Sequence, residues 1–433
     1  MSSSPKVPSP FSFRDYRLYW LARLASTIGA TAMVVVIGWQ VYDIARDGGM
    51  SRGEAALQLG YVGLAQFVPL FALVLVAGWV ADRVDRRFVA RATILLELLC
   101  AGMLAWLTAS GRIDLPSLFG IAALLGIARA FAGPALGALA PNLVPREVLP
   151  QAIAMSSVAW QAGTIAGPAI GGFLYAAYPA LPYEVSAALF AVSLLCFLLI
   201  RPVPRADADR RPSPWAQMIE GVRYVRGNRL VLGAISLGLF AVLLGGATAM
   251  LPIYARDILQ VGPQGLGALR AAPAVGATLI AAWFSFRPLK TNVGVKMLWA
   301  VAVFGLATAA FGLSGSLWLS VLLLGITGAA DMFSVFIRQS LIQLHTPDAM
   351  RGRVGAVSSL FISASNELGE ARSGFLAAAI GPVAAVVGGG VLAAGVVAAW
   401  ARLFPELRLA RSFDVPNMDE PNRTATLAKE TPA

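Results

Sequence analysis

Long apolar runs separated by short polar segments organise the whole chain. A helix needs about 20 mostly apolar residues to cross a bilayer. Twelve stretches meet this requirement, at residues 18–42, 60–81, 88–110, 116–138, 152–176, 183–200, 230–254, 265–286, 293–313, 317–338, 353–379 and 382–403. The pattern predicts an all-α membrane protein with twelve transmembrane helices. The first run is too long for the apolar core of a cleavable signal peptide, so we expect it to remain as a helix.

The longest connection, residues 201–229, divides the apolar runs into two sets of six. It begins rich in proline and arginine and then becomes amphipathic around Met218, Val222 and Val225. Such a segment predicts a helix on the membrane surface. The predicted units are an N-terminal six-helix bundle (1–200), a cytoplasmic linker with an amphipathic helix (201–229), a C-terminal six-helix bundle (230–405) and a disordered cytoplasmic tail (406–433).

The two sets of apolar runs resemble each other at an offset of 202 residues. The offset aligns Gly126 with Gly328, Pro145 with Pro347, Ser156-Ser157 with Ser358-Ser359 and Gly172-Phe173-Leu174 with Gly374-Phe375-Leu376. A gapless repeat of this kind predicts two pseudo-symmetric bundles. Membrane proteins built from repeats place their substrate site between the two halves, near the middle of the bilayer.

Composition and charge support a lipid environment and a fixed orientation. The chain is 58% hydrophobic and only 13% charged, whereas soluble domains carry about 25% charged residues. The net charge of +11 does not predict nucleic-acid binding, because the basic residues lie in short loops. Loops rich in arginine face the cytoplasm. With both termini in the cytoplasm, the opposite side keeps essentially Arg46, Arg52, Arg112 and Arg256.

Several kinds of chemistry are not predicted. The two cysteines lie in apolar runs and the single histidine, His345, lies in a polar loop, so no metal site is expected. Glycine-rich runs lie in apolar segments instead of strand-to-helix turns, which argues against a nucleotide site. We expect no cofactor, and the absence of a nucleophile–base arrangement predicts that the chain is not an enzyme.

A charged motif follows the second apolar run. It reads Gly78-x-x-x-Asp82-Arg83-x-x-Arg86-Arg87 and resembles the signature loop of the major facilitator superfamily, although Asp85 stands where that family usually has glycine. The resemblance implies that Asp82 faces the start of the eleventh helix, near Arg351-Gly352-Arg353, and stabilises the outward-open state. A carboxylate near a helix N-terminus is favoured by roughly 0.3–1 kcal/mol. Alternatively, the loop only anchors the topology. The matching loop at 284–290 lacks the aspartate.

Two further motifs resemble the same family. Arg129-x-x-x-Gly133 resembles its arginine motif, which implies a role in proton or substrate handling. A second motif resembles one associated with drug/proton antiporters and implies export, although it also fits simple tight packing of small residues; its members are Gly163, Gly167, Pro168, Gly171 and Gly172. Three segments resemble the branch of this family that includes bacterial siderophore exporters of the enterobactin-exporter type. They are residues 346–354, Gly38-Trp39-Gln40-Val41 and Leu64-Ala65-Gln66-Phe67.

Ionisable residues inside the apolar runs are candidate functional groups, because burial of charge in a membrane is expensive. The offset of 202 relates Arg129 to Asp331, so we expect both to face the central cavity, as a pair or as separate substrate and proton groups. Glu367 and Glu370 share one helical face and are candidates for proton coupling or for a neutralised ion-pair network. Packing or snorkelling is the simpler interpretation of Glu97, and snorkelling that of Arg23 and Arg270. Gln40 and Asn366 are candidates for substrate contact or for interhelical hydrogen bonds.

The sequence therefore predicts a secondary active transporter in the cell (inner) membrane. We expect it to export an amphipathic small molecule in exchange for protons by alternating access, as a monomer embedded in the lipid bilayer. The alternatives are an importer, a facilitator or a lipid translocator of the same fold, or a membrane partner or sensor that transports nothing.

Overall fold

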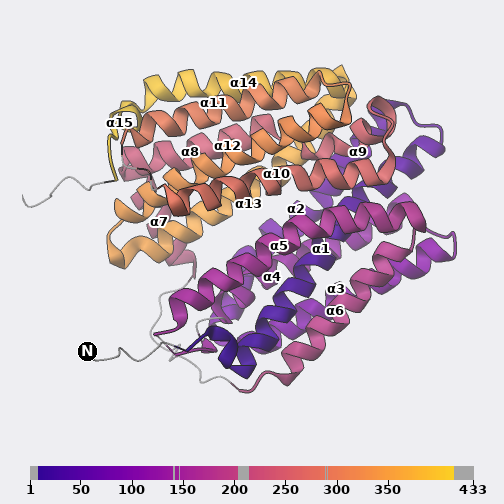
Figure 1. Cartoon of the computed structure of the whole chain (residues 1–433), viewed down its shortest axis with the longest axis horizontal. Coiled ribbons are helices and arrows are strands. Elements are labelled where there is room, and N and C mark those ends of the chain that lie inside the picture. The colour runs from indigo at the N-terminus through magenta and orange to yellow at the C-terminus, as the bar shows by residue number, and fades with distance from the viewer. Residues whose placement is uncertain are drawn as a thin grey trace, which may run out of the picture.

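The computed structural model consists of helices joined by turns and irregular connections, without strands, over the residues it describes, which are 8–139, 142–145, 147–202, 214–287, 289 and 291–413. Figure 1 shows the helices arranged side by side in two groups. The first group contains α1 (Arg14–Asp47), α2 (Arg52–Arg83), α3 (Arg86–Ala109), α4 (Leu115–Leu139), α5 (Leu149–Ala177) and α6 (Leu181–Leu199). The second contains α8 (Arg229–Gly245), α10 (Gly262–Phe286), α11 (Val293–Gly312), α12 (Leu317–Leu344), α13 (Asp348–Ile380) and α14 (Pro382–Leu403).

Ten helical segments in the described part of the chain are long and apolar enough to cross a membrane. Each apolar run recognised in the sequence lies largely within one helix, or one near-continuous helical segment, of the structure. The helices α5 and α13 are not among the ten. The prediction of a multi-spanning helical membrane protein is therefore confirmed, whereas the count of twelve spans remains a prediction.

Helices of each group pack mainly on one another. In the first group, α1 packs on α5 and α6, and α4 packs on α2 and α3; in the second, α12 packs on α10 and α11, and α14 packs on α8 and α11. The groups meet along two helix pairs, α2 with α13 and α5 with α10. A site between the groups therefore lies near these helices, and α1 also contacts α9 and α10 there.

Glycines related by the repeat allow both of these helix pairs to approach closely. A Cβ atom at Gly374 would lie 2.6 Å from the Cα of Gly60, and a Cβ atom at Gly172 would overlap the carbonyl oxygen of Pro263. Gly172 and Gly374 are equivalent at the offset of 202. The two crossings between the groups are thus built from equivalent positions, where the absence of a side chain lets the backbones touch.

Other glycines set the packing within each group. A Cβ at Gly163, Gly167 or Gly171 would meet α1, within residues 27–32. Their neighbour Pro168 lies inside α5, which continues through it. The antiporter-like motif therefore packs three of its glycines inside the first group and turns Gly172 toward the second.

The segment after α8 is irregular. A 3₁₀ turn (η3, Thr248–Met250), a short α9 (Leu251–Ile253) and a π-helix (η4, Tyr254–Ile258) follow it. The guanidinium of Arg372 in α13 donates to the carbonyl oxygens of Leu243 and Leu244 at 2.8 and 2.7 Å. Carbonyls at a helix end lack partners in the helix, and inside a membrane they must find them within the protein. Arg372 supplies that partner and holds the end of α8 against α13.

The predicted amphipathic helix forms as α7 (Pro214–Gly227). Val225 is buried among residues of α8 and α13, and Met218 and Val222 pack against the same cluster. Trp215 and Ile219 remain exposed. Part of the apolar side of α7 therefore contacts protein, and only the remainder is available to the membrane surface.

Candidate functional site

Arg129 of α4 lies between the two groups of helices. Gly126, one turn earlier, lets α4 lie against α2, because a Cβ there would overlap the backbone of Gln66. The Arg129 guanidinium then donates to the side-chain oxygen of Gln66 at 2.9 Å. It also forms an ion pair with Glu367 of α13, with 2.8 Å between Nη2 and Oε1. This ion pair joins a helix of one group to a helix of the other.

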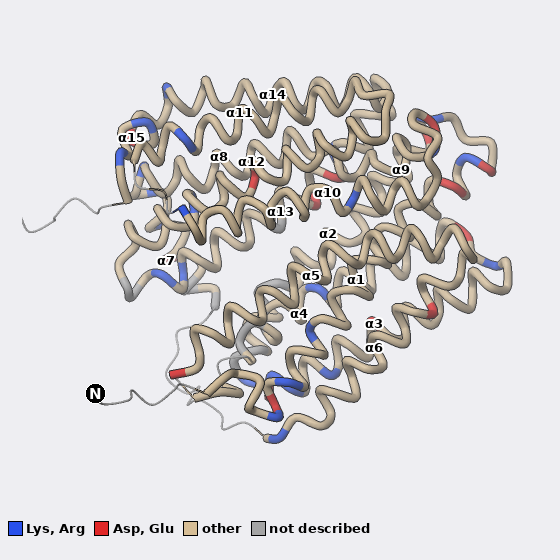
Figure 2. Tube along the Cα trace, in the orientation of Figure 1, with Lys and Arg blue, Asp and Glu red and all other residues tan. Residues whose placement is uncertain are grey.

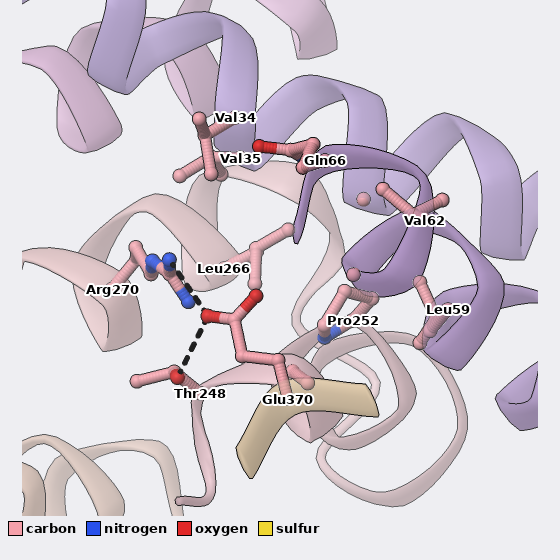
Figure 3. Close-up of a pocket in the computed structure, with 13 residues that line it drawn as sticks. Val34, Val35, Leu59, Val62, Gln66, Thr248, Pro252, Leu266, Arg270 and Glu370 are labelled. Carbon is pink, nitrogen blue, oxygen red and sulfur yellow. Dashed lines mark hydrogen bonds and ion pairs between the residues drawn. The ribbon is translucent and has the colours of Figure 1, made fainter. Parts of the chain in front are cut away.

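The second carboxylate of α13 also pairs with an arginine. Glu370 is 3.5 Å from the guanidinium of Arg270 in α10 and accepts a hydrogen bond of 3.2 Å from the Thr248 hydroxyl (Figure 3). Arg270 and Thr248 both belong to the second half of the chain. Glu367 therefore bonds across the interface, whereas Glu370 bonds within its own half.

A small cavity lies beside these pairs. Its volume is about 50 Å³, and Figure 3 shows apolar side chains around the Glu370–Arg270 pair. Its lining includes Val34, Val35, Leu59, Val62, Gln66, Thr248, Pro252, Leu266, Arg270 and Glu370. Pockets for drug-sized ligands have volumes of about 300–1,000 Å³. The cavity has room for little more than water, so this conformation is contracted around the ion pairs.

Charged residues concentrate at the ends of the helices, with few between them (Figure 2). We call the end that carries the connections 48–51, 110–114 and 313–316 the outer end, because we expect it to face the cell exterior. The carboxylate of Asp257, whose side chain is 9% exposed, lies 3.3 Å from Arg46 and 3.2 Å from Arg52. It also accepts a 2.8 Å hydrogen bond from Tyr42. These contacts connect η4 to α1 and α2.

Arg256 adds a second set of ion pairs at the outer end. Its guanidinium is 2.7 Å from Asp43 and 2.6 Å from Asp47. Asp257 and Arg256 have opposite charges and each has partners of the complementary sign in the other group of helices. We call these two sets of contacts the outer latch, and they hold the outer end closed.

The predicted gating loop lies at the opposite end. Gly78 is within α2, Arg83 stacks over the Trp79 ring at 4.7 Å, and Arg86 begins α3. Arg87 forms an ion pair of 2.6 Å with Asp85. The Asp85 side chain also accepts a hydrogen bond of 2.9 Å from the backbone N–H of Arg87, so the residue that replaces the family's glycine caps the start of α3.

The partner expected for this loop has other contacts. The side chain of Asp82 lies outside the described residues, so its gating role stays a prediction. Arg353, near the start of α13, is 2.6 Å from Glu220 of α7, and Arg351 donates to the carbonyl oxygen of Gln343 at 2.9 Å. In this conformation the linker helix therefore holds the start of α13.

Arg129 and Asp331 do not pair with each other. Arg129 bonds Gln66 and Glu367, and the cation that acts on Asp331 is Arg338 of the same helix. The repeat relates equivalent positions in two bundles, which share a depth without being in contact. Of the two possibilities expected from sequence, separate groups is the one that the geometry favours.

Two predicted polar candidates differ in their surroundings. Gln40 is buried inside the first group, where its amide donates to Thr108 at 3.2 Å and its oxygen accepts from Tyr183 at 2.8 Å. Asn366, next to Glu367, is exposed. Gln40 therefore serves as an interhelical bridge in this conformation, and Asn366 keeps a free surface for contact.

Sequence reasoning missed several charged residues that make these contacts. Arg270 pairs with Glu370, although its position in the sequence favours snorkelling, and no motif in the sequence points to the contacts of Asp257. Arg338, buried over Gly238 in the second group, was also missed. Arg338 lies at the very edge of an apolar run and Asp257 just beyond one, where charge is ordinary. A signal was available for Arg270, since an arginine six residues inside a predicted span needs a partner.

The geometry defines a class of protein. Two groups of membrane helices meet at repeat-related crossings, with ion pairs and a small cavity in the interface, as in transporters of the major facilitator superfamily. The chain belongs to the transmembrane secretion effector family of that superfamily, whose model matches residues 6–431. Members of the superfamily are transporters and not enzymes, in agreement with the prediction from sequence.

Relatives and solved structures support this membership. The enterobactin exporter EntS of Escherichia coli O1:K1 / APEC is 28% identical over 389 residues, covering 88% of this chain and 90% of the relative. The protein of the same name from Shigella boydii serotype 18 has the same identity and coverage.

The fold is similar to a D-xylose-proton symporter, with a TM-score of 0.69 at 13% identity over 91% of this chain and 98% of that one. It is also similar to a POT family transporter, with a TM-score of 0.71 at 14% identity over 91% and 96%.

Proposed function

We propose that this transporter exports an amphipathic small molecule in exchange for protons, by alternating access across the bacterial inner membrane. The proposal includes twelve transmembrane helices in two halves, residues 1–200 and 230–405, with both termini in the cytoplasm. The observation that carries it is the ion pair between Arg129 and Glu367, which joins the two halves. The relation to enterobactin exporters supports the direction of transport and the membrane.

The ion pair gives a route by which protons act on conformation. A ligand shifts an equilibrium only as far as it binds one state better than the other. A proton on Glu367 neutralises the carboxylate and removes its attraction for Arg129 across the interface. Protonation therefore weakens a contact that exists only while the halves are closed around it. Glu367 is the group that we assign to proton exchange.

Substrate and proton each break the same pair. A substrate that takes the place of the Glu367 carboxylate at Arg129 separates the pair, and a proton on Glu367 separates it by another route. The empty, unprotonated protein keeps the pair, and a transporter that changes between its two states only when it is loaded carries out exchange. Glu370, with its partner Arg270, lies one turn further along α13 and extends the polar surface that the substrate meets.

The lining of the cavity supports an amphipathic substrate. Valine and leucine side chains of α1 and α2 face it together with the Gln66 amide, the Thr248 hydroxyl and the Glu370–Arg270 pair. Ligand sites of this composition bind apolar bodies and orient them by a few polar contacts. Asn366 and Asp331 remain candidates for further polar contacts as the halves separate.

Purified protein in proteoliposomes tests the proposal. A panel of amphipathic compounds, including catecholate siderophores, is offered with and without an imposed proton gradient, and both accumulation and counterflow exchange are measured. We expect gradient-driven accumulation by the wild type. Glu367→Gln should retain counterflow and lose accumulation, while Glu184→Gln, at an exposed position in α6, should behave as the wild type.

The outcomes separate the alternatives. Accumulation by Glu367→Gln equal to that of the wild type would remove Glu367 from proton coupling. Wild-type transport that ignores the gradient would identify a facilitator, and the opposite direction of accumulation would identify an importer. Movement of labelled phospholipid instead of solutes would identify a lipid translocator.

A further inference from the structure

Arg129 has a second carboxylate in reach of its charge. Glu97 lies in α3, which packs on α4. Counting from the connection between these helices, Glu97 lies twelve residues before Ala109 and Arg129 lies fourteen residues after Leu115. At 1.5 Å per residue these positions are about 18 and 21 Å from the outer ends of their helices. The two residues therefore lie at nearly the same depth on neighbouring antiparallel helices.

Glu97 is buried without a hydrogen-bond partner. It is 6% exposed, and among the described residues no hydrogen bond or ion pair of its carboxylate is found. Burial of such a group is costly unless another charge or a proton compensates for it. Packing alone does not require a carboxylate here, since its neighbours Ile94 and Ala101 are apolar and equally buried.

Few charged or titratable groups lie near Glu97 on its own helix and on the helices around it. The charge that acts on it is that of Arg129, which is the one charged residue of α4. On α3 the nearby titratable group is the buried Cys100 thiol. The one charged residue of α6, Glu184, is exposed near the outer end. Arg23 of α1 donates to the Tyr19 hydroxyl.

The Arg129 guanidinium has the freedom to change partners. Its side chain is 43% exposed, whereas that of Glu367 is only 7% exposed. One donor is held by Gln66 and another by Glu367, and a guanidinium has five N–H donors. When the halves separate, α13 carries Glu367 away while α3 and α4 stay packed together.

We propose that Glu97 is a positioning residue whose carboxylate pairs with the Arg129 guanidinium whenever the Arg129–Glu367 pair is broken. This inference rests on the proposed function, because it requires that the pair open during transport. When the guanidinium changes its partner from Glu367 to Glu97, its charge stays neutralised in the membrane. It also stays positioned to bind Glu367 or substrate again. The open state is thereby stabilised by a carboxylate of the first half alone.

The test measures how often the outer end opens. Spin labels at Ser110→Cys and Ser316→Cys report the distance between the halves in nanodiscs by double electron–electron resonance. We expect Glu97→Gln to lower the outer-open population about tenfold, which corresponds to about 1.4 kcal/mol. Glu97→Asp should recover part of the population. Thr93→Val is the matched control, because it removes another buried polar group of α3 without removing charge.

A double-mutant cycle separates this role from a structural one. In the background Arg129→Gln, Glu97→Gln should no longer shift the population, because no arginine remains to be neutralised. An equal shift in both backgrounds, or no shift in either, would overturn the proposal. Glu367→Gln, measured for accumulation in parallel, tests the proposed function separately: its loss of coupling together with an unshifted Glu97→Gln would reject only the role of Glu97.

Discussion

Asp257 offers the sharpest test of the outer latch. Replacement by asparagine keeps the size of the side chain and an oxygen that accepts from Tyr42, but it removes the charge shared by Arg46 and Arg52. Arg52 is 58% exposed, and an exposed pair contributes about 0.2–1 kcal/mol. Weakening the Tyr42 hydrogen bond to a charged acceptor adds roughly 1 kcal/mol. With the better-buried Arg46 included, the closed state should lose about 2 kcal/mol.

This free energy predicts a large change in population. Each 1.4 kcal/mol is a factor of ten, so the ratio of open to closed outer ends should rise about 30-fold. A molecule that is open about 1% of the time would become open roughly a quarter of the time. The assay is the distance distribution between spin labels on Ser110→Cys and Ser316→Cys. The native Cys100 and Cys196 are buried, and a sample without the engineered cysteines checks that they take no label.

The matched control is Asp47→Asn. Asp47 also belongs to the outer latch but is 68% exposed, so its loss should change the population less than threefold. The reasoning would be refuted if Asp257→Asn left the distances unchanged, or if Asp47→Asn produced an equal shift. Added salt should narrow the difference between Asp257→Asn and the wild type, because it screens the exposed pairs.

Three other variants probe packing and hydrogen bonding. Gly172→Ala should hold the outer end apart and shift the spin-label distances upward, because its methyl group overlaps the Pro263 carbonyl; Gly355→Ala, with open space around it, should have no effect. Arg372→Gln should lower the thermal unfolding temperature, since two carbonyls lose a charged donor worth about 1.5–3 kcal/mol, and an unchanged temperature would contradict this. Gln40→Leu should destabilise the fold by about 1–3 kcal/mol with transport per folded molecule unchanged, whereas altered substrate preference would place Gln40 at the substrate.

The helices could be predicted from sequence because lipid imposes a simple requirement. A run of about 20 apolar residues has few alternatives to a membrane helix, and the runs recognised in sequence lie in helices. The repeat went further, since Gly172 and Gly374, aligned by the offset, both lie at crossings between the groups. The repeat identifies the two positions as equivalent, and the structure shows that each is a contact between the groups.

The partners of the charged residues could not be predicted in the same way. A helix that is apolar on every side gives no pattern from which its rotation can be inferred, so the partner of Arg129 could have been Asp331 or Glu367. The outer latch joins residues more than 200 positions apart in the sequence, and no local pattern connects them. Asp82 shows the reverse case, in which a motif predicts a role for a side chain that the structure does not describe.

The interruption after α8 divides the candidate membrane span Arg229–Ile258 into two parts that are held by different partners. The part before Gly246 is bound to α13 through Arg372, and Ser373 donates to the carbonyl oxygen of Gly246 at 2.7 Å. The part after it carries Arg256 and Asp257, which are bound to the first group of helices. A displacement of α13 therefore pulls on this joint from one side while the outer latch resists from the other. Glu367 and Arg372 both lie on α13. Movement of this helix after the Arg129–Glu367 pair breaks therefore strains the contacts of the outer latch.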